Sequence, residues 1–181
     1  RLEDAERRLR QAIDAGTPWS TDFPQAVWLS LYLGVWRHDL AEVLTAVGRL
    51  EEAEEARRSS LEAWESTGDA VLAAFPYGKG LAHYRLGELL HQTGRSEEAS
   101  RQLAAALSIM EDLSRRRPDL PTCQWQLICL LANCPDPAFR NPPRAVALAK
   151  HVLPARAGHY WRYLALAQYR SDQWQDAADS I

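Results

Sequence analysis

Three cysteines in the last third of the sequence are the first residues whose type could do chemistry. Cys123, Cys129 and Cys134 have five and four residues between neighbours and no histidine beside them, which matches no zinc-binding spacing. An odd number of cysteines also cannot form a complete set of disulfides. We therefore expect buried or partly buried thiols, as is usual in a reducing compartment such as the cytoplasm.

Histidine and glycine motifs offer two further candidates, and both have the wrong spacing. His83 and His91 are eight residues apart, whereas metal-binding pairs on a helix are four apart. Gly78-Lys79-Gly80 lacks the remaining residues of a phosphate-binding loop, and the sequence contains neither a nucleophile elbow nor a kinase signature. We therefore expect no enzyme activity, no catalytic residue, no metal ion and no cofactor.

Charge and hydropathy bear on the partners. The 181 residues carry a net charge of −3 and the pI is near 6.0, so no basic field is available for nucleic acid. Apolar runs are all shorter than the roughly 18 residues of a membrane span. The chain starts with Arg1 and has no apolar signal region. We expect part of a longer protein that binds neither nucleic acid nor membrane.

A repeated phrase of six residues indicates the architecture that must hold any site. Gly-Arg-(Leu or Ser)-Glu-Glu-Ala occupies residues 48–53 and 94–99, and a shortened copy opens the chain at residues 1–5. The copies are 48 and 46 residues apart, which is typical of an array of repeated units.

Each repeated unit reads as a helical hairpin. Leucines three or four residues apart predict a first helix with one buried face, and Gly48 and Gly94 are placed to end it in the left-handed conformation. Glutamates then open the second helix, where they suit the positive end of the helix dipole. The residues expected on the inward face of the second helix are Ala53, Ala56 and Ser60 in one copy and Ala99, Leu103 and Ala106 in the next.

This pattern resembles the tetratricopeptide repeat (TPR) family. The residues that match its motif are Leu86, Gly87, Gly94, Ala99 and Ala106, and near the C-terminus Trp161, Leu164, Ala165 and Ala177, with Asp172 where glycine is usual. The resemblance implies an all-α fold, in which antiparallel helical hairpins stack into a right-handed superhelix. The units exceed the family's length of about 34 residues. Trp28, Leu31 and Trp36 before Leu40 predict that the extra turns lie in the first helix.

A narrower resemblance covers residues 130–150, which run through Asn133-Cys134-Pro135-Asp136-Pro137 to Lys150, and the pair Tyr160-Trp161. It is similar to the ends of TPR arrays in large bacterial proteins, often attached to serine/threonine kinase domains. This resemblance implies a regulatory or scaffolding segment as the alternative function.

The expected organisation is a single repeat domain over residues 1–181. It divides into a half-unit at 1–15, units at 21–68, 69–117 and 121–153, and a partial unit at 158–181. We expect a connection at Gly16–Trp19, and then a first helix opened by Thr21 or Asp22 with Pro24 in its first turn. Its partner helix should cover Leu50–Ser66 and end near Gly68. The prolines and glycines of residues 75–80 predict that the next helix starts only at Leu81 and runs to Thr93.

Function is expected to follow from this geometry. In such arrays the first helix of each pair lines the concave wall, where aromatic and arginine side chains anchor a peptide or a partner protein. The expected lining residues are His38, Asp39, Glu42, Tyr84, Arg85, Glu88, His91, Arg162, Tyr163, Tyr169 and Arg170. Trp64 and Trp161 are expected to pack between helices, whereas the roles of Trp19 and Trp174 stay open. A solvated face without a ligand and self-association through exposed ends of the array are the remaining alternatives.

Overall fold

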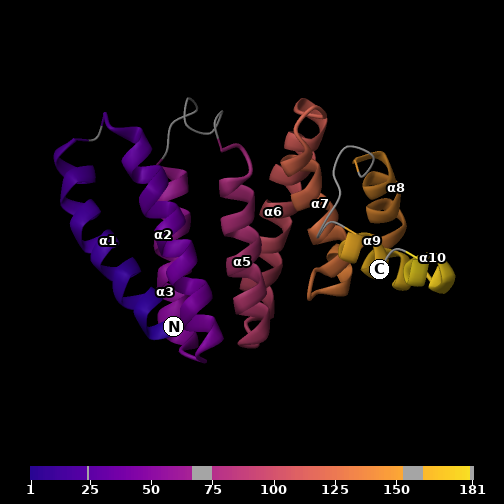
Figure 1. Cartoon of the computed structure of the whole chain (residues 1–181), viewed down its shortest axis with the longest axis horizontal. Coiled ribbons are helices and arrows are strands. Elements are labelled where there is room, and N and C mark those ends of the chain that lie inside the picture. The colour runs from indigo at the N-terminus through magenta and orange to yellow at the C-terminus, as the bar shows by residue number, and fades with distance from the viewer. Residues whose placement is uncertain (24, 67–74, 153–160, 180–181) are drawn as a thin grey trace.

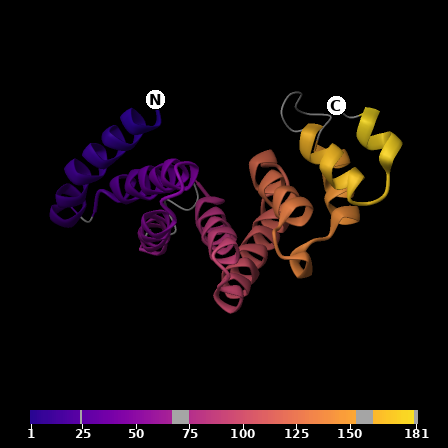
Figure 2. The same ribbon diagram turned by 90° about the horizontal axis from the view of Figure 1, so that it is seen from below.

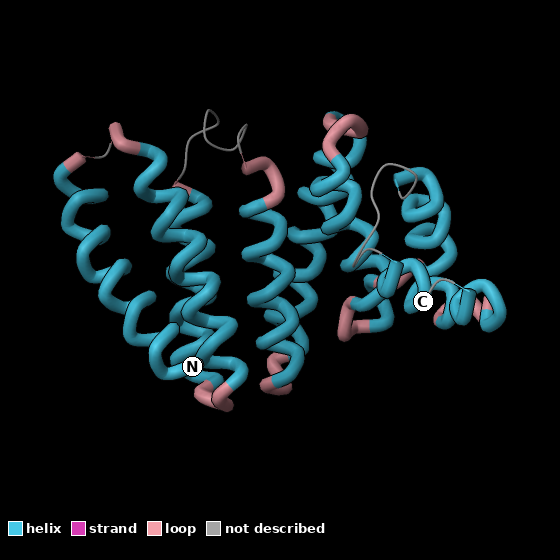
Figure 3. The backbone as a smooth tube through the Cα atoms, viewed as in Figure 1, coloured by secondary structure: helices cyan, strands magenta, loops and turns pink. Residues whose placement is uncertain are grey.

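The structure is a computed structural model and describes residues 1–23, 25–66, 75–152 and 161–179; of residues 152 and 161–163 it describes the backbone alone. Within these ranges every regular element is a helix (Figures 1 and 3). The helices are α1 (Leu2–Asp22), α2 (Val27–Ala46), α3 (Leu50–Glu65), α5 (Gly78–Gln92), α6 (Ser96–Arg116), α7 (Pro121–Asn133), the 3-10 turn η1 (Pro137–Phe139), α8 (Pro142–Val152), α9 (Trp161–Tyr169) and α10 (Trp174–Asp179).

Consecutive helices pair as hairpins, and one backbone hydrogen bond recurs at the turn of each pair. In α2/α3 the amide of Arg49 donates to the carbonyl of Leu44 over 2.9 Å. The same bond is 2.9 Å long in the other three hairpins, where it joins Arg95 to Leu90, Asn141 to Leu131 and Gln173 to Gln168. The four hairpins are therefore copies of one unit.

Three of these turns contain a residue in the left-handed backbone conformation. Gly48 and Gly94 both have φ of 80°, and Asp172 has φ of 59°. The first two confirm the predicted turn glycines, and Asp172 occupies the position at which the repeat pattern has glycine. The α7/α8 turn is longer instead, and the side chain of Arg140 holds it by donating to the carbonyls of Cys134 and Pro135, over 2.6 and 2.7 Å.

An alanine four residues after each turn packs into the core. Ala53, Ala99, Ala145 and Ala177 are all buried, because a small side chain there lets the two helices of a hairpin approach closely. The other predicted inward residues, Ala56, Ser60, Leu103 and Ala106, are buried too. The predicted inward face of the second helices is therefore confirmed. Cys123 and Cys134 are buried and Cys129 is partly buried, as expected.

Successive second helices are joined by an arrangement of four charged residues that occurs twice, here termed the ion clamp. Each arginine of a clamp contacts both glutamates at 2.5–3.1 Å. The first ion clamp joins α1 to the start of α3 and consists of Glu6, Arg10, Arg49 and Glu52; the second joins α3 to the start of α6 and consists of Glu54, Arg58, Arg95 and Glu98. Because all four contacts recur, α1 occupies the second-helix position of a unit.

Three helix boundaries differ from the sequence prediction. The expected connection at Gly16–Trp19 is wrong, because α1 continues through Pro18 to Asp22. A proline inside a helix costs about 3 kcal/mol, and packing of Gly16 against Leu33 and Trp36 of α2 offsets it; a Cβ on Gly16 would lie 3.2 Å from both side chains. As a result α2 begins at Val27 and not at Thr21 or Asp22.

The third difference is the start of α5, at Gly78 and not at Leu81. Gly78 and Gly80 are buried because they face large side chains of the preceding and following helices, so the glycines serve close packing and do not delay the helix. The residues by which the units exceed the usual repeat length do not all lie in the first helix, as was predicted. In one unit the first helix, α2, has 20 residues, but in the next unit the second helix, α6, is the long one with 21. Pro24, Gly68 and residues 69–74 lie outside the described residues.

The row of hairpins bends into an arc. Figure 2 shows α1 at one end and α10 at the other, with the start of α1 and the end of α10 on the same side of the arc. The first helices α2 and α5 and the end of α7 contribute side chains to one shared pocket, which is the candidate site.

Candidate functional site

A pocket of about 390 Å³ lies where the first helices of three successive units meet. Its walls come from α2, α5 and the α7/α8 turn, and one second-helix residue, Arg57 of α3, reaches into it. The lining residues are Glu42, Thr45, Arg57, Arg85, Glu88, Leu89, His91, Gln92, Asn133 and Pro135.

Arg57 is a charged residue at a buried position of this site. It is only 5% exposed, and 46 residues further on the same position of the repeat holds Leu103, which is fully buried. A charged side chain is rarely buried unless it is paired, because it loses its hydration. One unit of the array therefore has an arginine that faces the pocket at the position where the next unit has a core leucine.

The guanidinium of Arg57 is paired with two residues of α2. It donates to Oε1 of Glu42 over 2.7 Å and to Nδ1 of His38 over 3.1 Å. Because arginine can only donate, Nδ1 of His38 must accept, so the proton of the neutral ring sits on Nε2. That nitrogen lies 3.8 Å from Oε1 of Glu42.

Burial and the charge of Arg57 set the protonation of this group. Burial, followed by the charge of Arg57, lowers the pKa of His38 to about 4. Burial alone would raise the pKa of Glu42, but the hydrogen bond and charge of Arg57, with the charge of Arg85, outweigh it and lower that pKa. His38 is therefore neutral and Glu42 ionised at neutral pH.

A second arginine extends the network onto α5. Arg85 donates from Nη1 to Oε2 of Glu88 over 2.8 Å, and its Nε lies 3.6 Å from Oε1 of Glu42. The Nε atoms of Arg57 and Arg85 are buried and have no hydrogen-bond partner. The pocket is thus short of acceptors, because two carboxylates serve two guanidinium groups.

The structure brings together four of the predicted site residues, Glu42, Arg85, Glu88 and His91, in this pocket, with His38 bound to Arg57 beside it. Tyr84 lies in the core at 4% exposure, where burial raises the pKa of its phenol far above the usual range. Asp39 lies at the surface, where partial desolvation by its neighbours, followed by the charge of Glu42, raises the pKa of its carboxyl group.

Of the C-terminal members of the predicted set, Tyr169 and Arg170 do not line the pocket. Tyr169 is 58% exposed and packs edge-on against Trp174, with ring centroids 4.7 Å apart. Arg170 donates to the carbonyl of Ala132 in α7. Arg162 and Tyr163 belong to α9, but their side chains, like that of Trp161, lie outside the described residues.

Sequence reasoning missed the other lining residues, which are Thr45, Arg57, Leu89, Gln92, Asn133 and Pro135. The signal for Arg57 was present, because the 46-residue offset aligns it with Leu103 and so marks a charge at a core position. Asn133 and Pro135 carried no such signal, because their place depends on the long α7/α8 turn folding back toward α5.

Across the described ranges, no group of three or more histidine, cysteine, aspartate or glutamate side chains is placed to hold a metal ion. None of the helices described is both long enough and apolar enough to cross a membrane.

Comparison with known proteins places the fold. No protein-family model matches the chain, and no curated protein sequence matches it. A crystal structure of a variant of nearly identical TPR-like repeats, from a protein assigned as a kinesin light chain of Podosopora anserina, aligns with 97% of this chain and 92% of its own. The TM-score is 0.50 and the identity 19%.

The fold is that of TPR-like repeats. A second structure of the same Podosopora anserina repeats aligns over the same shares of the two chains, with 19% identity and a TM-score of 0.48. The likeness to the first structure, at 19% identity, concerns the fold alone, which is the TPR-like arrangement of hairpins. It agrees with the four matching hairpin turns and with the all-helical secondary structure of the described residues.

Proposed function

We propose that the chain is a protein-interaction module that holds a peptide segment of a partner protein against its first helices, with the Arg57 pocket as the anchor point. The observation that carries this proposal is the buried Arg57, which stands where the next copy of the repeat has a core leucine. A stable array needs only a leucine there. An arginine that pairs with Glu42 and reaches the pocket adds polar groups that a ligand can contact.

The chemistry of the pocket favours a peptide that brings acceptor oxygens. Two guanidinium groups share two carboxylates, and both Nε atoms are without acceptors. These Nε atoms are buried beyond a ligand's reach, but 39% of the Arg85 side chain is exposed. A backbone carbonyl or a carboxylate of a bound peptide can therefore accept from the guanidinium of Arg85, and such charge-assisted hydrogen bonds are short and strong. Arg85, Glu88 and His91 lie one turn apart on α5, so an extended segment can contact them in sequence.

A library of random peptides displayed on phage, selected against the whole chain, tests the proposal. Selected peptides should bind the Arg57→Met and Arg85→Glu variants at least about tenfold more weakly, which corresponds to a loss of ~1.4 kcal/mol. Methionine keeps the length of the buried stem of Arg57, so the fold should persist, as a melting curve verifies. Arg101→Glu, on the exposed side of α6, is the matched control and should bind like the unchanged chain.

Two outcomes would refute the proposal. In the first, repeated selection enriches no peptide; in the second, the enriched peptides bind both pocket variants as tightly as the control. A regulatory segment of a larger kinase-type signalling protein is the second role that the sequence predicts. Within the described residues no geometric feature favours it over the binding module.

A further inference from the structure

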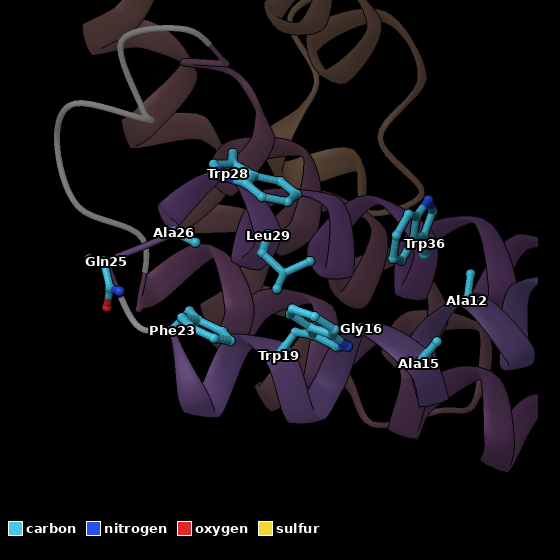
Figure 4. Close-up of a pocket in the computed structure, with 10 residues that line it drawn as sticks. All are labelled: Ala12, Ala15, Gly16, Trp19, Phe23, Gln25, Ala26, Trp28, Leu29 and Trp36. Carbon is cyan, nitrogen blue, oxygen red and sulfur yellow. The ribbon is translucent and has the colours of Figure 1, made fainter.

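A second hollow, between α1 and α2, shows by contrast what the Arg57 pocket can recognise. It has a volume of about 500 Å³, and Figure 4 shows Trp19, Trp28 and Trp36 among its lining side chains. Gln25 contributes the one amide side chain there, so that hollow offers a ligand apolar contacts and few hydrogen bonds. The Arg57 pocket is lined mainly by side chains that donate or accept hydrogen bonds. Its ligand is therefore selected through polar groups.

The charges of the arginines and glutamates that line the Arg57 pocket cancel. Glu42 accepts a hydrogen bond from Arg57, and Glu88 accepts one from Arg85, so each guanidinium group has a carboxylate of its own. An anionic ligand group would lie beside two carboxylates and a cationic one beside two guanidinium groups, and like charges placed together oppose binding. A neutral polar group meets neither penalty.

The pocket also presents a hydrogen-bond donor beside an acceptor. The contacts of Glu42 with the two arginines and with His38 all involve Oε1. Arg85 uses Nη1 for Glu88 and places Nε 3.6 Å from Oε1 of Glu42. Within the described residues, Oε2 of Glu42 and Nη2 of Arg85 therefore keep their capacity for hydrogen bonds. The side chain of Glu42 is 46% exposed and that of Arg85 39%, so a ligand can reach both.

We propose that the Arg57 pocket recognises the primary amide of an asparagine or glutamine side chain in the bound peptide, whose oxygen accepts from Arg85 and whose nitrogen donates to Glu42. A primary amide carries its acceptor oxygen and its donor nitrogen side by side on one carbon atom, and it has no charge. Aspartate and glutamate have the same shape but only accept, and lysine only donates. This inference rests on the proposed function and narrows it to two kinds of peptide side chain.

Peptides enriched from the phage library against the whole chain are the probe, and they should share a position that holds asparagine or glutamine. Each is synthesised with the amide residue, with the matching acid, with lysine and with methionine at that position. Calorimetry at about pH 8, above the ordinary pKa of histidine, measures the binding. All three replacements should weaken it, and the acid should do so at least about tenfold, because it keeps the shape and adds a carboxylate beside Glu42.

A variant of the chain assigns the preference to Glu42. Glu42→Gln removes the negative charge, while its side-chain oxygen can still accept from Arg57. The penalty for the acid form of the peptide should then fall below about threefold. Glu51→Gln, at the exposed start of α3, is the control and should keep the full penalty. Melting curves establish that both variants are folded; if Glu42→Gln does not fold, the four peptide forms on the unchanged chain still decide the proposal.

Failure of this inference is distinguishable from failure of the proposed function. Enriched peptides that share no asparagine or glutamine, or that bind equally well in the acid form, would overturn the amide preference. Weaker binding to Arg57→Met and Arg85→Glu would in that case still support the peptide site. Enrichment of aspartate or glutamate would also overturn it, because the guanidinium of Arg85 would then take a carboxylate. If no peptide is enriched, the amide preference and the peptide site are both refuted.

Discussion

Gly34 lies so close to the indole of Trp64 that a side chain at this position would fit only if the ring shifted. A Cβ on Gly34 would be 3.0 Å from Nε1 of Trp64, and the carbonyl of Gly34 accepts a 2.7 Å hydrogen bond from Ser60. Forty-six residues further on, a Cβ on Gly80 would be 3.2 Å from Met110. Glycine on the first helix and a large residue on the second are thus a repeated packing pair, which sets how closely the two helices approach.

The ring of Trp64 also packs against Gly78 at the start of α5, and this contact predicts the effect of Gly78→Ala. A Cβ there would overlap Cη2 of the ring, so Trp64 or the start of α5 must move. We expect the free energy of unfolding to fall by about 1–3 kcal/mol, although alanine is the better helix former. Denaturant unfolding measures it. The same change in a Trp64→Leu background is the control, where most of the additional loss should vanish; an equal loss in both backgrounds would show that the ring is not the cause.

Ala99 gives a second test of the packing between hairpin helices. It is 1% exposed and packs beneath Gly87 and Leu90 of α5, so Ala99→Trp overfills the interface. The melting temperature should drop, with a loss of stability of about 1–3 kcal/mol or more. Ala104→Trp on the exposed face of the same helix should change stability by less than about 0.5 kcal/mol. Similar melting curves for the two variants would disprove the assignment of the buried face.

Repetition explains why much of this fold could be predicted from the sequence. The turn glycines Gly48 and Gly94 are 46 residues apart, and so are the buried alanines Ala53 and Ala99. In its own hairpin, each glycine ends the first helix and each alanine packs between the two helices. Residues that depart from the repeat pattern at a single position were harder to interpret. Pro18 predicted a break, but the packing of α1 on α2 outweighs the local cost of proline.

The candidate site was predictable to a similar degree. Glu42, Arg85, Glu88 and His91 follow from the face of each first helix that points away from its leucines. Asn133 lines the pocket only because of how three units are placed relative to one another, and no local pattern encodes that placement. Tyr84 was expected in the groove, but it lies in the core because its position on α5 turns toward α6 and α7.

The ion clamps predict a salt-dependent contribution to stability. Arg95 contacts Glu54 and Glu98, and Arg49 makes the equivalent contacts in the first clamp. All are near the surface, so screening should weaken them. Arg95→Ala should lower the melting temperature at low salt and much less at about 1 M salt, where the Debye length is about 3 Å. Arg101→Ala is the control on α6. A loss that is the same at both salt concentrations would mean that the clamp does not act through charge.

The buried His38 predicts how stability depends on pH. Its pKa is about 4 in the folded chain and about 6.5 when unfolded, so between these values the unfolded state binds more protons. The free energy of unfolding should therefore be highest above pH 6.5 and decline as the pH falls toward 4. From pH 7.5 to 5 the loss from this group should be on the order of 1–2 kcal/mol. This range lies above the ordinary pKa of carboxylates, so Glu42 contributes little to the change.

Denaturant unfolding of the His38→Gln variant isolates this contribution. Glutamine can still accept the hydrogen bond from Arg57 through its side-chain oxygen, but it does not titrate, so the decline between pH 7.5 and 5 should become shallower. His151→Gln, at an exposed position of α8, should leave the slope unchanged. If His38→Gln keeps the full slope, the ring of His38 takes up its proton as readily in the folded chain as in the unfolded one, and neither burial nor Arg57 keeps it neutral.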